Sequence, residues 1–299
     1  MFILHIDSGV EMRGGQWQAL HLMRGLAAAG HRIRLLAPAG SPLLEAAHED
    51  GIDAQPLGIA ALAGAASGVD LIHAHDARAH TLALLGAKPA VVSRRVGFPV
   101  RRGVGSRWKY GRAAHFIAVS RYVRQTLLDA GIAEERITVV YDGVPVANGP
   151  IGREGRSSVV ALDSDDPGKG KKIVEQAAAL AKIGVRFSKN LMEDLPRAAV
   201  FVYITDLEGL GSAALLAMAS GATVLASRVG GLPEIVEDGV TGMLTANEPS
   251  AVAEGMDRLL GDPALRARLS ACARARVERE FTIGRMVSET VRVYERMLS

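Results

Sequence analysis

The chain has 299 residues, of which 48% are apolar and 22% charged, so it can bury large cores and should form two domains. The formal net charge of +3 is mild, and no zinc-finger, helix-turn-helix or RNA-binding signature is present, so we expect no nucleic-acid partner. The single cysteine, Cys272, excludes an internal disulfide and is expected to be a buried, inert thiol.

The first half alternates apolar runs rich in β-branched residues with helical patterns, which is typical of a doubly wound parallel sheet. The opening run is too short for a signal peptide and lacks its basic start, so we interpret it as a strand. Strands are predicted at 2–6, 32–37, near 54, 69–73, 90–93, 116–119 and 137–140, and helices at 16–29, after 42, within 58–68, at 77–85, from 107 and at 121–130.

A polar, glycine-rich linker is predicted at 149–158, followed by a second α/β pattern. This organisation predicts domains at 1–148 and 149–285. Strands are predicted at 158–162, 185–187, 200–204 and 223–226, and helices at 171–182, 191–198, 212–220, 249–260, 264–280 and, with one apolar face, 286–298.

Two common nucleotide-binding motifs are absent. A nicotinamide enzyme would carry G-x-G-x-x-G after its first strand, whereas this chain has Gly9 and then Gly14-Gly15. The segment 168–172 lacks the first glycine and the Ser/Thr of a P-loop.

The stretch 203–242 contains two loops that each follow a predicted strand. The first loop is Glu208-Gly209-Leu210-Gly211, after which Ser212 is expected to cap a helix, and the second loop covers 230–234. Both loops should lie at the carboxyl end of a parallel sheet, where open α/β sheets bind ligands. The helix that starts after Gly211 favours a negative ligand such as a phosphate.

The motifs of this stretch are E-G-L-G, S-A-A-L-L-A-M-A-S-G and G-G-L-P-E-I-V-E-D-G. In them the chain resembles the nucleotide-sugar-binding half of family 4 (group 1) GT-B glycosyltransferases, and the resemblance extends more weakly over most of the chain. It implies two Rossmann-like domains facing a cleft, with helix 286–299 packing back on the first. A strand and a helix of the second domain look deleted, so that domain is expected to be smaller than usual.

The resemblance also implies a function. A sugar would move from a nucleotide-diphosphate donor to a glycan, lipid-linked or other cell-envelope acceptor, with retention, without metal and with no cofactor beyond the donor. The expected location is cytoplasmic, with peripheral attachment to the inner face of the membrane as an open alternative. The predicted catalytic residues are Glu208, Lys169 and His75, and the predicted donor-binding residues are Gly14, Gly15, Arg95, Gly209, Leu210, Gly211, Ser212 and Leu216.

Each role follows from the family position. Glu208 would accept hydrogen bonds from sugar hydroxyls, while Lys169 and the helix start after Gly211 would stabilise the departing diphosphate. Gly14 and Gly15 would reach towards the donor phosphates and sugar.

Two positions depart from the family pattern. Leu216 stands where relatives carry the acid that binds the ribose, and leucine accepts no hydrogen bond; it could equally be a core residue. Asp163 stands where relatives place an arginine for the diphosphate. A non-catalytic protein that binds a sugar nucleotide or a glycan is therefore the alternative function.

His73-Ala74-His75 ends a predicted strand with both histidines on one face. No third ligand follows at metal spacing, so we expect no zinc; His73 would be structural and His75 near the ligand.

Two segments are basic, and one of them contains Arg94, Arg95, Arg101 and Arg102. Arg95, with Arg94 as the weaker candidate, would bind the donor diphosphate from across the cleft. The alternative is that both belong to a basic face for the acceptor or an anionic membrane surface. The second basic segment contains Arg266, Arg268, Arg274, Arg276 and Arg279.

Overall fold

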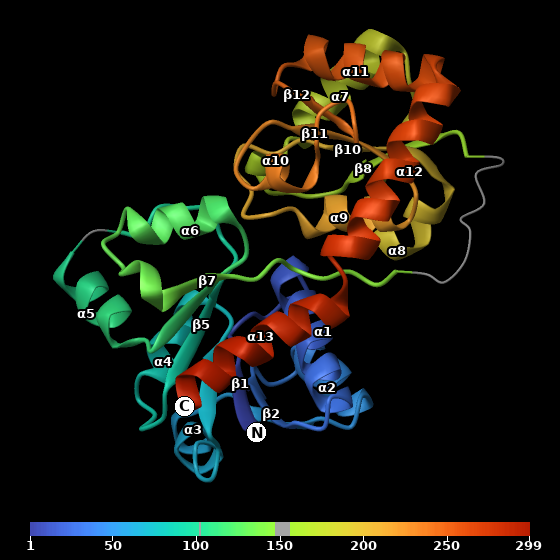
Figure 1. Cartoon of the computed structure of the whole chain (residues 1–299). Coiled ribbons are helices and arrows are strands. Elements are labelled where there is room, and N and C mark those ends of the chain that lie inside the picture. The colour runs from blue at the N-terminus through green and yellow to red at the C-terminus, as the bar shows by residue number, and fades with distance from the viewer. Residues whose placement is uncertain (102, 147–155) are drawn as a thin grey trace. The chain divides into compact units, whose positions relative to one another are not determined.

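The computed structural model describes residues 1–101, 103–146 and 156–299. The chain forms two compact units: unit 1 contains residues 1–143 and 283–299, and unit 2 contains residues 144–282 (Figure 1). The predicted boundary after residue 148 and most of the predicted linker at 149–158 fall in 147–155, outside the described residues, as does Arg102.

Unit 1 is built on a parallel sheet with the strand order β3-β2-β1-β4-β5-β6-β7. The chain moves outward from β1 to β3 and then restarts at β4 on the other side of β1, so the strand order reverses between β1 and β4. Ligands of open α/β sheets bind at the carboxyl ends of strands beside such a reversal. The strands are β1 (Phe2–Ile6), β2 (Arg32–Ala37), β3 (Asp53–Pro56), β4 (Leu71–Ala74), β5 (Ala90–Arg94), β6 (His115–Ala118) and β7 (Ile137–Val139).

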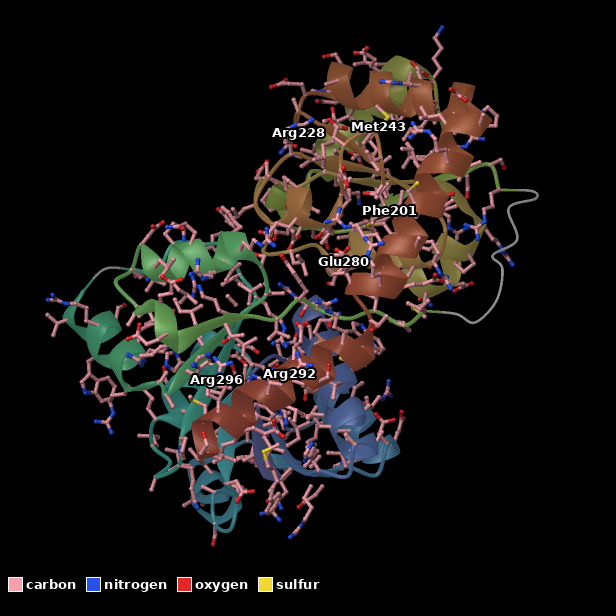
Figure 2. The ribbon with its side chains drawn as sticks, viewed as in Figure 1. Phe201, Arg228, Met243, Glu280, Arg292 and Arg296 are labelled. Carbon is pink, nitrogen blue, oxygen red and sulfur yellow. The ribbon has the colours of Figure 1, made fainter. Side chains whose placement is uncertain are left out.

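Helices cover the sheet of unit 1, and the last helix of the chain is one of them (Figure 1). Helix α13 packs beside α1, where a Cβ on Gly25 would lie 2.4 Å from Cγ2 of Val287. The buried face of α13 includes Val293 and Tyr294, whereas Arg292 and Arg296 lie one turn apart on its exposed face (Figure 2). The helices are α1 (Gly14–Ala28), α2 (Pro42–Glu49), α3 (Ile59–Ala65), α4 (Ala77–Ala83), α5 (Val104–Arg112), α6 (Arg121–Leu128) and α13 (Ile283–Leu298), and Glu134–Arg136 forms a 3₁₀ turn.

Unit 2 has a smaller parallel sheet with the order β12-β11-β10-β8-β9, five strands against seven in unit 1. Phe201 on β10 is fully buried in its core (Figure 2). The strands are β8 (Ser158–Leu162), β9 (Val185–Ser188), β10 (Ala198–Tyr203), β11 (Thr223–Ser227) and β12 (Met243–Thr245). The helices are α7 (Lys171–Ala181), α8 (Leu191–Asp194), α9 (Ser212–Ala219), α10 (Leu232–Ile235), α11 (Pro249–Gly261) and α12 (Pro263–Glu280), with 3₁₀ turns at Pro167–Lys169 and Leu195–Arg197.

The predicted fold class, two doubly wound α/β domains, is confirmed, but two local predictions are wrong. Ser212 does not cap α9, because Gly211 with a φ of +108° is the residue before the first turn. Cys272 is exposed rather than buried. It lies on α12 between Ser270 and Ala273, which face the core, and its own position on the helix faces solvent.

Candidate functional site

In unit 2, the two glycine loops lie directly against each other. The backbone N–H of Gly231 donates to the carbonyl oxygen of Glu208 at 3.1 Å. A Cβ on Gly230 would lie 2.0 Å from that same oxygen, and one on Gly231 would lie 2.2 Å from the carbonyl oxygen of Gly209. Only glycine permits such a close approach of two backbones, so the second loop fixes the shape of the first.

The carboxylate of Glu208 is held by three donors. Its Oε2 accepts from Lys169 Nζ at 2.9 Å and from the hydroxyl of Tyr203 at 2.5 Å, and its Oε1 accepts from the N–H of Gly209 at 3.0 Å. Burial, and then the charge of Glu208, raise the pKa of Tyr203 well above 10, so Tyr203 is the proton donor. The side chain of Glu208 is 16% exposed and that of Lys169 is 27% exposed. The two predicted catalytic residues of this unit are therefore an ordered ion pair with access to solvent.

The loop that carries Lys169 is joined to the end of β10. Gly170 has a φ of +66°, and a Cβ there would lie 2.6 Å from the carbonyl oxygen of Ile204. The carbonyl oxygen of Gly168 accepts from the N–H of Asp206 at 2.9 Å and from Oγ1 of Thr205 at 3.0 Å. This packing places the loop before α7 beside the first glycine loop.

Asp163 makes ion pairs with two lysines. Lys171 Nζ donates to its Oδ1 at 2.6 Å, and Lys189 Nζ lies 3.7 Å from its Oδ2. The hydrogen bond from Lys171 lowers the pKa of Asp163. The acid in the family's arginine position is thus partnered by cations of its own unit.

Leu216 is half-buried and does not belong to the core face of α9. It shares an open face with Ser212, Ala213 and Ser220, whereas its neighbour Leu215 is fully buried. Leu210, also predicted to bind the donor, has its side chain buried, so only its backbone is available to a ligand.

In unit 1, two carboxylates at the strand reversal shape the segment before α1. Asp7, after β1, accepts from the N–H of Gly9 at 2.8 Å and from Nε2 of Gln16 at 3.0 and 3.2 Å. Asp76, after β4, accepts from the N–H and the hydroxyl of Ser8 at 2.5 and 2.7 Å. The helix that follows begins at Gly14, so Gly14 and Gly15 form its first turn rather than a loop before it. A Cβ on Gly15 would lie 4.0 Å from Cδ of Arg95.

Three buried histidines lie beneath this edge of the sheet. His5 pairs with His73 in the register of β1 and β4, and His75 follows β4. Nδ1 of His5 lies 2.8 Å from Nε2 of His75. His73 contacts the hydroxyl of Tyr294 through Nδ1 at 2.5 Å and that of Ser93 through Nε2 at 2.8 Å. His73 therefore ties α13 to the sheet, as its predicted structural role requires.

His5 supplies the third histidine that the sequence analysis did not find. The described part of the chain contains one group of three potential metal ligands, and it consists of these histidines, with ligand atoms within 4.8 Å of one another. Five of their six ring nitrogens already have hydrogen-bonding partners, and the exception is Nε2 of His5. A metal ion bound by these histidines would replace hydrogen bonds that they make to one another and to their neighbours.

All three histidines are held neutral. Burial, and then the charge of Arg95, lower the pKa of His5 to about 3. The pKa of His73 and that of His75 lie well below 6.5, again chiefly because of burial.

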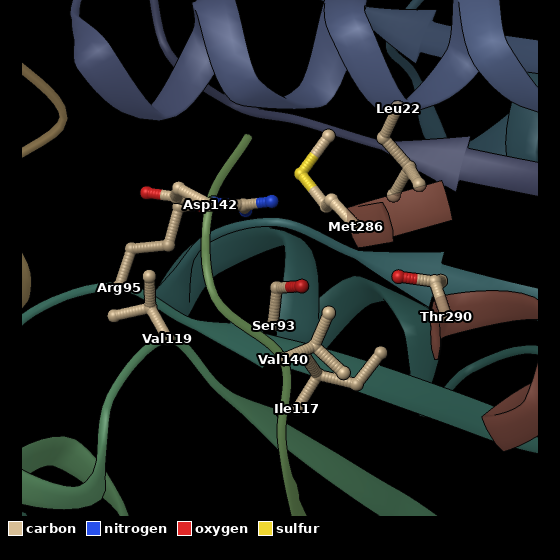
Figure 3. A pocket seen from close by; sticks show the side chains of 9 residues that line it. All are labelled: Leu22, Ser93, Arg95, Ile117, Val119, Val140, Asp142, Met286 and Thr290. Carbon is tan, nitrogen blue, oxygen red and sulfur yellow. The ribbon is translucent and has the colours of Figure 1, made fainter. Parts of the chain in front are cut away.

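Arg95 points inward rather than to the surface. Its Nη1 lies 3.2 Å from Nδ1 of His75 and its Nε lies 3.4 Å from Oδ1 of Asp142. The side chain is 13% exposed and borders a cavity of about 10 Å³ that Ser93, Met286 and Thr290 also line (Figure 3). Arg94 is engaged elsewhere, with the hydroxyl of Tyr110 at 2.9 Å and the carbonyl oxygen of Phe98.

Two family models match the chain, Glycosyltransferase Family 4 over residues 12–148 and Glycosyl transferases group 1 over residues 163–276. The chain belongs to the group 1 glycosyltransferases. It is 36% identical over 115 residues to alpha-maltose-1-phosphate synthase of Mycobacterium tuberculosis; the matched segment covers 36% of this chain and 30% of the relative. It is 34% identical over 216 residues to D-inositol 3-phosphate glycosyltransferase of Salinispora arenicola; this matched segment covers 69% of this chain and 44% of the relative. The matched segments thus span less than half the length of these relatives.

Solved structures show the same GT-B fold. HepE of Anabaena, solved with UDP and glucose, superposes with a TM-score of 0.85 at 18% identity over 98% of this chain and 99% of the other. Sucrose-phosphate synthase of Thermosynechococcus elongatus superposes with a TM-score of 0.78 at 18% identity over 99% and 98%.

The predicted residues of this glycosyltransferase fall into two sets. Unit 2 brings together Lys169, Glu208, Gly209 and the start of α9, and unit 1 brings together Gly15, His75 and Arg95. Sequence reasoning missed Tyr203 and His5. Tyr203 is the last residue of β10 and precedes Glu208 by five positions; it opens the stretch 203–242, but no motif assigned it a role. His5 could have been found by aligning the ends of β1 and β4, which are neighbours in this fold.

Proposed function

We propose that this glycosyltransferase moves a sugar from a nucleotide-diphosphate donor to a glycan, lipid-linked or other cell-envelope acceptor, with retention and without a metal. The observation that carries the proposal is the fixed Glu208 carboxylate, held by Lys169, Tyr203 and the N–H of Gly209 at the carboxyl end of β10. A carboxylate in this position can accept hydrogen bonds from sugar hydroxyls and orient the donor. Because the HepE structures contain UDP and UDP-glucose, UDP is the first nucleotide to test.

In the proposed reaction, the bond between the anomeric carbon and the diphosphate oxygen breaks and its electron pair stays on that oxygen. The acceptor hydroxyl oxygen bonds to the anomeric carbon on the same face, and its proton passes to the leaving phosphate. The charge that develops on the diphosphate needs stabilisation. The candidates for this role in unit 2 are Lys169 and the start of α9 at Gly211 and Ser212. The candidates in unit 1 are Arg95 and the first turn of α1 at Gly14 and Gly15.

Release of a nucleoside diphosphate from UDP-sugars tests the proposal, with Glu208→Gln as the decisive variant. Gln keeps the shape of the side chain but loses its charge and one acceptor, so we expect turnover to fall about 100-fold or more with little change in melting temperature. Glu254→Gln, on the exposed face of α11, is the matched control and should keep full activity. Wild-type turnover in Glu208→Gln would remove the assignment.

The alternative function, a non-catalytic binder of sugar nucleotides or glycans, is favoured by Leu216 and Asp163. Neither can replace the family residue chemically, since leucine accepts no hydrogen bond and a carboxylate repels phosphate. The two functions differ in turnover. A binder would show saturable stabilisation by UDP-sugars, about 2.7 kcal/mol at 100 times the dissociation constant, and no diphosphate release with any acceptor.

Helix α5 supports the proposal that the acceptor lies at an anionic membrane surface. None of its residues is buried, and it presents Val104 at 77% and Trp108 at 56% exposure. Phe98, just before it, is 62% exposed, and Arg101 and Arg107 are exposed cations of the same segment. Exposed aromatic and basic side chains together suit a lipid headgroup region. No helix among the described residues is long and apolar enough to span a bilayer.

The second basic segment does not support such a surface, because its arginines are used within unit 2. Arg266 donates to the carbonyl oxygen of Leu260 at 2.8 Å, and Arg276 donates to that of Glu234 at 2.9 Å. Cosedimentation with phosphatidylglycerol vesicles tests the segment at α5 against another exposed basic pair of unit 1. Arg101→Glu with Arg107→Glu should abolish binding, and Arg292→Glu with Arg296→Glu on α13, an equal change in charge, should not. Equal loss in both variants, or equal binding to phosphatidylcholine, would contradict the assignment.

A further inference from the structure

Arg95 sets the protonation of two buried histidines. A guanidinium has only N–H donors, so Nδ1 of His75, 3.2 Å from Nη1 of Arg95, must be an acceptor. His75 is neutral and therefore carries its proton on Nε2, which donates to Nδ1 of His5 at 2.8 Å. His5 in turn carries its proton on Nε2, a buried atom that has no hydrogen-bonding partner among the residues that the structure describes. The reverse orientation would direct an N–H of His75 at the guanidinium.

Both ring nitrogens of His75 are thus occupied within unit 1. Its side chain is also buried, so it offers no polar atom to a donor. The neighbouring Arg95 differs, because among the described residues its Nη2 has no hydrogen-bonding partner and the side chain keeps 13% exposure. Arginine carries considerable rotamer freedom, which is lost when the side chain binds a ligand. His75 and Asp142 remove that freedom in advance by holding Nη1 and Nε.

We propose that His5 is a positioning residue, which fixes the tautomer of His75 and thereby holds Arg95 ready to bind the diphosphate of the donor. The inference rests on the proposed function for the identity of the ligand, and it changes the role of His75 from direct contact to support of Arg95. The orphaned Nε2 of His5 agrees with it. What the proposal requires of His5 is that its Nδ1 accepts the hydrogen bond from Nε2 of His75.

Two substitutions of His5 separate positioning from packing. In His5→Asn, the amide oxygen can take the place of Nδ1 and accept from His75, whereas His5→Leu removes the acceptor and fills the position with an apolar side chain of similar size. Binding of UDP and of uridine to the full chain is measured by calorimetry, with GDP, ADP and their nucleosides in parallel. We expect His5→Leu to weaken diphosphate binding about tenfold and to leave nucleoside binding unchanged. His5→Asn should lie within about threefold of the wild type.

Equal weakening of diphosphate and nucleoside, or equal behaviour of His5→Leu and His5→Asn, would overturn the inference. A wild-type protein that binds none of the three diphosphates would overturn the proposed function instead. The tautomers are tested without any ligand, by ¹⁵N correlation spectra of the histidine rings. We expect the Nε2–H form for both His5 and His75, and Nδ1–H on either ring would overturn the relay itself.

Discussion

A single carboxylate oxygen, Oε2 of Glu208, accepts hydrogen bonds from both Lys169 and Tyr203. Hydrogen bonds to a charged group contribute about 1.5–3 kcal/mol each. We therefore expect Tyr203→Phe to lower the free energy of unfolding by about that amount and to lower kcat about tenfold, because Glu208 loses one of its supports. Measurement of both quantities in a Glu208→Gln background gives the control. There the hydroxyl has no charged partner, and the loss from Tyr203→Phe should shrink by half or more; an undiminished loss would place the effect of Tyr203 elsewhere.

Leu216 and Leu215 are adjacent residues with different surroundings, and they form a matched pair. Leu216 lies on the half-buried face of α9 with Ser212, so Leu216→Glu should fold with a melting temperature near that of the wild type. If this face meets the donor ribose, the new carboxylate should also tighten UDP binding. Leu215 is fully buried, and an unpaired carboxylate there should destabilise the protein by several kcal/mol. A Leu216→Glu variant as unstable as Leu215→Glu would show that Leu216 is part of the core.

Some residue-scale features could be predicted and others could not. The nearness of Lys169 and Glu208 agrees with the family resemblance, which assigns both residues to the donor site. The partners of His5 and Arg95 depend instead on which strands are neighbours in the sheet, and no local pattern contains that order. The position of Cys272 was mispredicted because α12 is apolar on only a narrow face, and the alanine-rich sequence does not mark it.

At the scale of elements, the two glycine loops act as one unit. A Cβ at position 231 would lie 2.2 Å from the carbonyl oxygen of Gly209, so Gly231→Ala must push the first loop away. We expect a loss of about 1–3 kcal/mol of stability and a larger loss of activity, since Glu208 precedes Gly209 directly. Gly261→Ala, at the end of α11 where nothing lies within 4 Å, should affect neither. Urea denaturation and turnover assays on both variants test this prediction. If Gly231→Ala had the stability and turnover of the wild type, the close packing of the two loops would be contradicted.

The elements themselves were largely predictable because the alternation of apolar runs and helical patterns is regular. The strands β1, β2 and β8 have the predicted bounds. The sequence did not predict β12, because this strand has only three residues and follows a turn. A segment this short does not show the alternation by which strands are recognised. Ser212 was misplaced as a cap because serine is the better capping residue, whereas the close approach of Leu232 and Ile235 to Gly211 requires a glycine at that point.

At the scale of the whole molecule, ionisable groups are divided unevenly between the units. All eight histidines lie in the first 143 residues, within unit 1. Seven of them have lowered pKa values, chiefly through burial. Five of the seven are buried: the pKa values of His5, His80 and His115 fall to about 3, 4 and 4, and those of His73 and His75 lie well below 6.5. The sequence alone shows that histidine is absent from the second half, but only the fold shows that five of the eight are buried.

This asymmetry predicts that mild acid destabilises unit 1 selectively. A histidine whose folded pKa is lowered contributes stability that is present above its unfolded pKa of about 6.5 and is lost as the pH falls towards the folded value. Between pH 7 and pH 5, His5, His80 and His115 should each remove about 2 kcal/mol from unit 1, and His73 and His75 act in the same direction. Hydrogen exchange at the two pH values, corrected for the intrinsic rate, should show faster exchange in β1 and β4 and little change in β10 and β11. His5→Asn should reduce the effect, because one of the titrating groups is gone. Equal acceleration in both units would contradict the prediction, since the sequence 144–282 contains no histidine.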